Sequence, residues 1–160
     1  MERWYLTCHK PGKKNLLHAQ IALERLNIMV FSPILRTYRS RADRPGQIRQ
    51  VIEPLFPGYM FIYFNPEIHT PSKVERNPGI SHLVRFAGGF PNISEAVIDS
   101  VMCLPMCSQA VSHLNKNNHQ SNNKLSSLNS QQQKKFKTLI EEENGEVRNS
   151  LFYSFIEEIN

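Results

Sequence analysis

Long apolar runs, a signal peptide and paired cysteines are all missing from this 160-residue sequence. No apolar stretch approaches the roughly 20 residues that a membrane-spanning helix needs. The opening residues MERWYLTCHK lack the apolar segment of a secretory signal. The three cysteines, Cys8, Cys103 and Cys107, have no CxxC spacing, which favours reduced thiols in a cytoplasmic protein.

Catalytic signatures are also missing. The sequence contains no Ser-His-Asp signature, no glycine-rich phosphate loop and no HExxH motif, and its six histidines lack the spacing of metal ligands. We therefore expect a protein that is not an enzyme and that uses no metal and no cofactor.

Positive charge is concentrated in the first fifty residues. They hold ten Lys and Arg against three acidic residues, a net charge of +7, whereas residues 51–110 carry −2 and residues 111–160 are neutral. One-sided positive charge favours a polyanionic partner such as nucleic acid. The alternative interpretation is a basic surface that serves only solubility.

The stretch VIEPLFPGYMFIYF, residues 51–64, organises the rest of the chain. Its prolines and Gly58 predict an extended turn, and the six apolar and aromatic residues after them predict a buried strand. Alternation places Tyr59, Phe61 and Tyr63 on one face and Met60, Ile62 and Phe64 on the other. Two apolar faces need two covers, so we expect the second cover to come from another domain or a partner.

Periodicity and turn residues predict the remaining elements. These are strands over 3–9, 30–35 and 79–86, and helices over 15–27, 72–76 and from Ser94 to Pro105. Residues 36–49 hold five arginines around Pro45-Gly46 and indicate a hairpin tip or a mobile loop, which could touch nucleic acid. The predicted fold class is α+β, with an antiparallel sheet flanked by helices.

The last third of the chain changes character. Residues 108–133, rich in Asn, Ser and Gln, indicate a polar linker. Residues 134–160 regain helical spacing on both sides of a break at residues 141–145, which predicts a small helical hairpin. Its apolar faces need a host, and the exposed side of the central strand is the obvious one.

A basic arc runs along the predicted first helix. Lys14, His18 and Arg25 fall within a narrow arc, although Ile21 intrudes on it, and Lys10 with Lys13 adds charge from the preceding turn. Phosphate contact is one interpretation of this arc. A plain solvated helix face is the other.

Three motifs together resemble the NusG family of transcription elongation factors, especially its RfaH-type antiterminator branch. They are the Trp4-Tyr5 start, EPLFPGYMFIYF and GISHLVRF, and the resemblance covers about residues 1–105. It implies a NusG-type domain over 1–107 that binds RNA polymerase and DNA, a linker over 108–133, and a KOW-derived tail over 134–160. It also implies a factor that clamps transcribing polymerase and suppresses pausing and termination.

The resemblance assigns partners to residues of the first domain. Phe56, Tyr59 and Phe61 would dock on the clamp helices of the largest polymerase subunit. Thr70 and Ser72 stand where the family carries an HTTT motif for the second-largest subunit. The loop and helix bearing Lys10, Lys13, Lys14, His18 and Arg25 would contact the non-template DNA strand, although Ala22, Leu26 and Pro78 depart from the family pattern.

The tail of the RfaH-type branch masks the polymerase site until DNA releases it. By that resemblance we expect an ion pair between Glu53 and Arg148, with a solvated Arg148 as the alternative. The expected interdomain residues are Ile140, Leu151, Phe152, Phe155 and the ion pair itself. In that branch the refolded tail also recruits a small-subunit ribosomal protein.

Two other functions compete with this interpretation. One is a nucleic-acid-binding module independent of RNA polymerase, which would use only the basic first helix. The other is a decaying paralogue whose tail no longer works. In every case we expect a cytoplasmic monomer that does not bind membranes.

Overall fold

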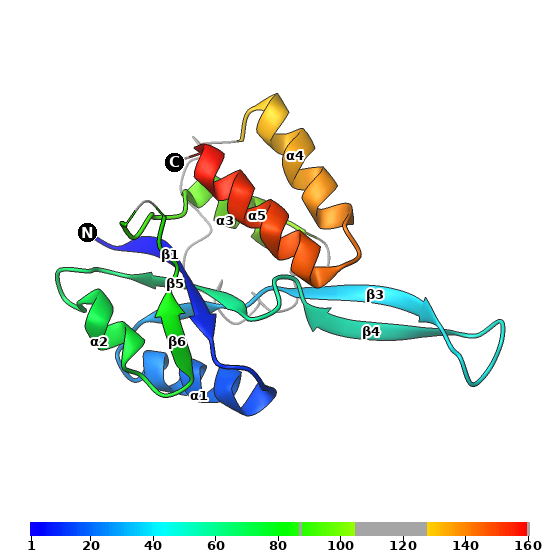
Figure 1. The fold of residues 1–160 in the computed structure, drawn as a ribbon, viewed down its shortest axis with the longest axis horizontal. Helices are drawn as coiled ribbons and strands as arrows, with labels where there is room; N and C mark the ends of the chain where they lie inside the picture. Colours follow the sequence, from blue (N-terminus) through cyan, green and yellow to red (C-terminus); the bar gives the residue numbers. More distant parts are fainter. Residues whose placement is uncertain (87, 105–127, 160) are drawn as a thin grey trace, which may run out of the picture.

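A four-stranded antiparallel sheet forms the centre of the molecule (Figure 1). The computed structural model describes residues 1–86, 88–104 and 128–159. The strands are β1 (Arg3–His9), β2 (Met29–Phe31), β3 (Ile34–Ser40), β4 (Ile48–Pro54), β5 (Tyr59–Phe64) and β6 (Ile80–Leu83). The helices are α1 (Lys13–Glu24), α2 (Pro71–Glu75), α3 (Glu95–Met102), α4 (Ser130–Glu141) and α5 (Gly145–Ile159).

The sheet has the order β2-β5-β1-β6, so the aromatic strand β5 lies inside it. β5 pairs with β1 from Arg3↔Phe64 to Cys8↔Tyr59, and with β2 along its other edge. β3 and β4 form a separate two-stranded ribbon that extends away from the body (Figure 1). Antiparallel sheets with helices give the mixed α+β fold that the sequence predicted.

The two faces of β5 have different covers, as its alternation predicted. Met60, Ile62 and Phe64 join a core cluster that includes Ala19 and Leu23 of α1 and Val74 of α2. Phe61 joins a second cluster that includes residues of α3, α4 and α5. Helices from the last third of the chain therefore cover the second face of the central strand.

Several element boundaries differ from the prediction. The strand expected over 30–35 is divided into β2 and β3 at Ser32-Pro33, because Pro33 has no N–H for a ladder hydrogen bond. For the arginine-rich segment the hairpin alternative is confirmed: residues 41–47 are the turn between the paired strands β3 and β4. α1 ends at Glu24, and Asn27 has a left-handed φ of 56°.

The tail also begins earlier than predicted. Ser130 starts α4 inside the range assigned to the linker, because Asn129 and Gln132 form a capping box that satisfies the first turn. Leu128 before it is buried in the second core cluster. The other residues of the predicted linker, 108–127, lie outside the described residues.

Among the described residues, no helix is long and apolar enough to cross a membrane.

Candidate functional site

The aromatic face of β5 and of the turn before it lies beneath α5. Phe56 and Phe61 are fully buried, with exposed fractions of 1% and 0%. Phe152 of α5 stacks on Phe56 with ring centroids 4.1 Å apart, and meets Phe61 edge-on at 5.7 Å. Three phenylalanines from segments almost one hundred residues apart thus form one contact.

Tyrosines extend this contact along β5. Tyr59 and Tyr153 meet edge-on with centroids 5.4 Å apart, and Phe86 approaches Tyr153 at 5.5 Å. Burial, together with a hydrogen bond to Tyr59, raises the pKa of Tyr153 above its usual range. The Tyr153 hydroxyl is therefore neutral in the docked tail at any ordinary pH.

Arg148 joins the tail to the turn before β5 through backbone carbonyls. Its guanidinium is fully buried and donates to the carbonyl of Leu55 at 2.7 Å. It also donates to the carbonyl of Glu142 at 3.0 and 2.8 Å and to that of Glu143 at 3.3 Å. Burial lowers the pKa of Arg148, while the carboxylates of Glu53 and Glu142 oppose that shift.

The expected ion pair between Glu53 and Arg148 is wrong. The Glu53 carboxylate instead accepts two hydrogen bonds from Arg39, at 3.2 and 3.0 Å, across the β3–β4 ribbon. Arg148 is not solvated either, because the carbonyls at the end of α4 and of Leu55 surround it. Glu53 therefore acts on Arg148 only through its electric field.

Two further contacts fix the start of α5 on the same turn. The side-chain amide of Asn149 donates to the carbonyl of Pro57 at 2.8 Å. A Cβ placed on Gly145 would lie 2.7 Å from Cγ of Pro57, so only glycine permits this approach. The turn that delivers Phe56 to the sheet is therefore held at several points by the tail.

The expected interdomain residues differ in how deeply they are buried and in what they contact. Phe152 and Phe155 are buried in the second core cluster, and Ile140 packs against it half-buried. Leu151 is 39% exposed and instead lines a groove between α4 and α5 with Leu139 and Phe155. Leu151 is not a member of the second core cluster and lies at the groove between the two tail helices, so the structure gives it no part in the contact with the sheet.

The basic residues expected at DNA are gathered on an open surface. Lys10, Lys13, Lys14, His18 and Arg25 are all exposed, on α1 or at its two ends. Ala19 and Leu23 on the opposite side of α1 are buried. Ile21, which intrudes on the basic arc, is 41% exposed.

The segment that stands in place of the HTTT motif forms the start of α2. Thr70 is its N-cap residue, and its hydroxyl accepts from the Lys73 amide at 3.4 Å. Thr70 and Ser72 are both exposed. Their side chains are accessible to a partner, although the hydroxyl of Thr70 already accepts the capping hydrogen bond of α2.

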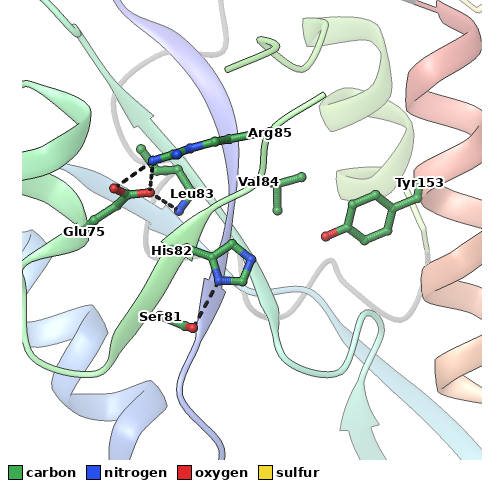
Figure 2. Close-up of a pocket in the computed structure, with 7 residues that line it drawn as sticks. All are labelled: Glu75, Ser81, His82, Leu83, Val84, Arg85 and Tyr153. Carbon is green, nitrogen blue, oxygen red and sulfur yellow. Dashed lines mark hydrogen bonds and ion pairs between the residues drawn. The ribbon is translucent and has the colours of Figure 1, made fainter. Parts of the chain in front are cut away.

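A polar hollow lies between β6 and Tyr153 of α5 (Figure 2). Its charged groups are paired with each other: Glu75 binds Arg85 at 3.1 Å and the Leu83 amide at 2.9 Å. His82 contacts Ser81 at 3.1 Å. Within the described part of the chain, no group of three His, Cys, Asp or Glu side chains is placed to hold a metal ion; Cys107 lies outside that part.

Sequence reasoning missed Tyr153 and Asn149 as contact residues. Asn149 and Tyr153 lie four residues apart on α5, directly after Arg148 and Phe152, so the helical periodicity of the tail was a signal that could have found them. The carbonyl partners of Arg148 left no such signal, because any residue type supplies a backbone carbonyl.

A family model described as transcription termination factor nusG matches residues 2–102. The chain belongs to the NusG family. The description of the family is that of a transcription termination factor. The matched range runs from β1 to α3, so α4 and α5 lie outside it.

The chain is also similar to a solved structure described as domain interaction in Thermotoga maritima NusG. The sequence identity is 20% and the TM-score is 0.38. The alignment covers 64% of this chain and 56% of that chain, so this chain matches little more than half of the Thermotoga protein.

Proposed function

We propose that this protein is an RfaH-type transcription elongation and antitermination factor whose tail covers its own polymerase-binding site. The observation that carries the proposal is the contact of Phe152 with Phe56 and Phe61. Phe56 and Phe61 belong to the part of the chain that the NusG family model matches. The helices α4 and α5, which cover these rings, lie outside that range.

The aromatic face has the composition of a binding hot spot. Phe56, Tyr59 and Phe61 present rigid rings on one side of the sheet and at its adjoining turn. Such rings supply most of the binding energy when a partner buries them. We propose the clamp helices of the largest polymerase subunit as that partner, because two helices can present an apolar face as α4 and α5 do.

The tail would compete with polymerase for these rings. Residues 1–107 would form the binding domain, and the helices α4 and α5, which begin at Ser130, would form the mask. While the tail is docked, polymerase can bind only the fraction of molecules in which it has opened, so the apparent affinity falls by that fraction. Burial of the rings supplies most of the energy of the closed state, and the bonds of Arg148 set its register.

Other parts of the surface would serve secondary contacts. The exposed basic residues of α1 would bind the non-template DNA strand and help to release the tail at particular operons. Thr70 and Ser72 would meet the second-largest polymerase subunit. A released tail would meet a small-subunit ribosomal protein, and the factor would act as a cytoplasmic monomer.

Binding to core RNA polymerase tests the proposal. We expect weak binding by the full chain and tighter binding by Phe152→Ala, which weakens the closed tail. Introducing Tyr59→Ala and Phe61→Ser into the Phe152→Ala variant should then abolish binding. Equal binding of polymerase by the parent and by Phe152→Ala would support an elongation factor but refute masking of the polymerase site by the tail.

The second candidate is a nucleic-acid-binding module independent of polymerase. The exposed basic surface of α1 favours it, because this surface needs no partner protein. If neither the parent nor Phe152→Ala binds polymerase, while neutralising Lys13 and Lys14 abolishes DNA binding, this second function replaces the first.

A further inference from the structure

The β3–β4 ribbon projects from the body (Figure 1). Most of its residues are exposed. Between Ile34 and Pro54 it carries five arginines against two acidic residues. Its root contacts the tail, but its outer half lies apart from the aromatic site and from α1 (Figure 1), so neither surface described above explains its charge.

The register gathers two of the arginines on one face. Arg39 and Arg49 stand directly opposite each other in the pairing of β3 with β4. Like charges at opposed positions destabilise a strand pair. Arg39 is partly neutralised by Glu53, whereas the Arg49 side chain has no ion-pair or hydrogen-bond partner among the described residues.

The turn of the ribbon adds further charge. Arg41 is paired with Asp43 at 2.6 Å. Arg44, next to it in the turn, is exposed and also has no ion-pair partner in the described part of the chain. The outer half of the ribbon thus offers two unpaired guanidinium groups, Arg44 and Arg49.

The opposite face of the ribbon combines exposed apolar side chains with polar ones. Tyr38, Ile48 and Ile52 lie on it, with exposed fractions of 69%, 68% and 59%. The same face carries Arg36, Ser40 and Gln50. A projecting ribbon with one cationic face and one face of mixed apolar and polar groups can enter a groove whose walls are phosphates and whose floor presents base edges and methyl groups.

We propose that the outer half of the β3–β4 ribbon binds duplex DNA in its major groove, with Arg44 and Arg49 on the phosphates. The major groove of B-form DNA admits a two-stranded β-ribbon, whereas the major groove of A-form RNA is too narrow for side chains to enter. This site is independent of the α1 surface and of polymerase binding.

Acidic residues of the tail restrict the part of the ribbon on which DNA can bind. Glu141, Glu142 and Glu143 line one hollow together with Leu35, Thr37 and Arg39 at the root of the cationic face. Phosphates placed at the root would meet these carboxylates. The duplex therefore lies against the outer half, beyond Arg39.

The test measures binding of the full chain to a random-sequence DNA duplex by fluorescence anisotropy at several salt concentrations. The double variant Arg44→Gln/Arg49→Gln removes two exposed charges. We expect its affinity at 0.1 M salt to fall by at least about tenfold, and the salt slope to decrease by about two. The control Lys134→Gln/Lys137→Gln removes the same charge from the exposed side of α4 and should leave the affinity within about twofold.

Two other ligands separate this site from the α1 surface. The ribbon variant should keep its affinity for single-stranded DNA, whereas Lys13→Gln/Lys14→Gln should lose single-strand affinity and keep the duplex. An unchanged duplex affinity in the ribbon variant would overturn the proposal. So would an equal loss in the control variant, or an equal loss for duplex DNA, single-stranded DNA and duplex RNA.

Discussion

Removing the ring of Phe152 should open the tail. Its side chain is 1% exposed and lies between Phe56 and Phe61, with centroids 4.1 and 5.7 Å away. Truncating a buried phenylalanine to alanine typically costs 3–5 kcal/mol. We take the lower end, because α5 can relax toward the sheet, so Phe152→Ala should weaken docking by about 3 kcal/mol, or roughly 150-fold.

Hydrogen exchange measures this change without polymerase. Amides of α5 exchange through opening of the tail, so their protection should fall by about two orders of magnitude in Phe152→Ala. Amides of β1 and β5 should keep most of their protection if the sheet stays folded.

The neighbouring residue provides the control. Leu151 is 39% exposed and lies outside the second core cluster, at the groove between α4 and α5, so Leu151→Ala should change the same protection by less than about 1 kcal/mol. Equal effects of the two substitutions would refute the reasoning, since they would show that the buried ring does not hold the tail.

Three more predictions concern the same contact. Arg148→Met leaves buried carbonyls without a donor and should destabilise docking by about 2–3 kcal/mol, whereas Glu53→Gln should cost under about 1 kcal/mol; thermal unfolding of both variants checks this. Because burial raises the pKa of Tyr153 in the closed form, the open form ionises first, so docking should weaken as pH rises above about 10. Hydrogen exchange of the α5 amides measures this weakening as a loss of protection at high pH, and that loss should be smaller in Tyr153→Phe. The same dependence of protection on pH in Tyr153→Phe and in the parent would contradict the prediction. Gly145→Ala should loosen the tail by contact with the Pro57 ring, and adding Pro57→Ala should restore α5 protection.

The sequence by itself determined most of the architecture. The alternation in residues 59–64 is a property of the strand geometry, so it placed the two faces correctly before any fold was known. Helical spacing in the tail likewise predicted two helices with a break between them, which the structure has at residues 142–144. Such local patterns predict the fold correctly because each side of a helix or strand faces either the core or the solvent.

The need for a second cover on β5 also followed from composition. An aromatic strand with two apolar faces cannot leave one of them in water without a large loss of hydrophobic free energy. Which ring of the tail would contact which ring of the sheet could not be obtained in this way. Phe152 and Leu151 are adjacent apolar residues, and only the docked rotation of α5 buries one and exposes the other.

Polar partners were decided by tertiary structure alone. Glu53 has Arg39 within reach across its own ribbon, and that local pairing leaves Arg148 to the carbonyls of Leu55 and Glu142. A charged residue in a sequence needs a partner of opposite charge or a hydrogen-bonding group. Which group becomes the partner depends on which lies within reach in the folded protein. Backbone carbonyls are acceptors at every residue, so the sequence does not indicate which of them will be used. The spacing of side chains thus fixed the elements and their faces, whereas the packing of α5 on the sheet fixed the contacts of the site.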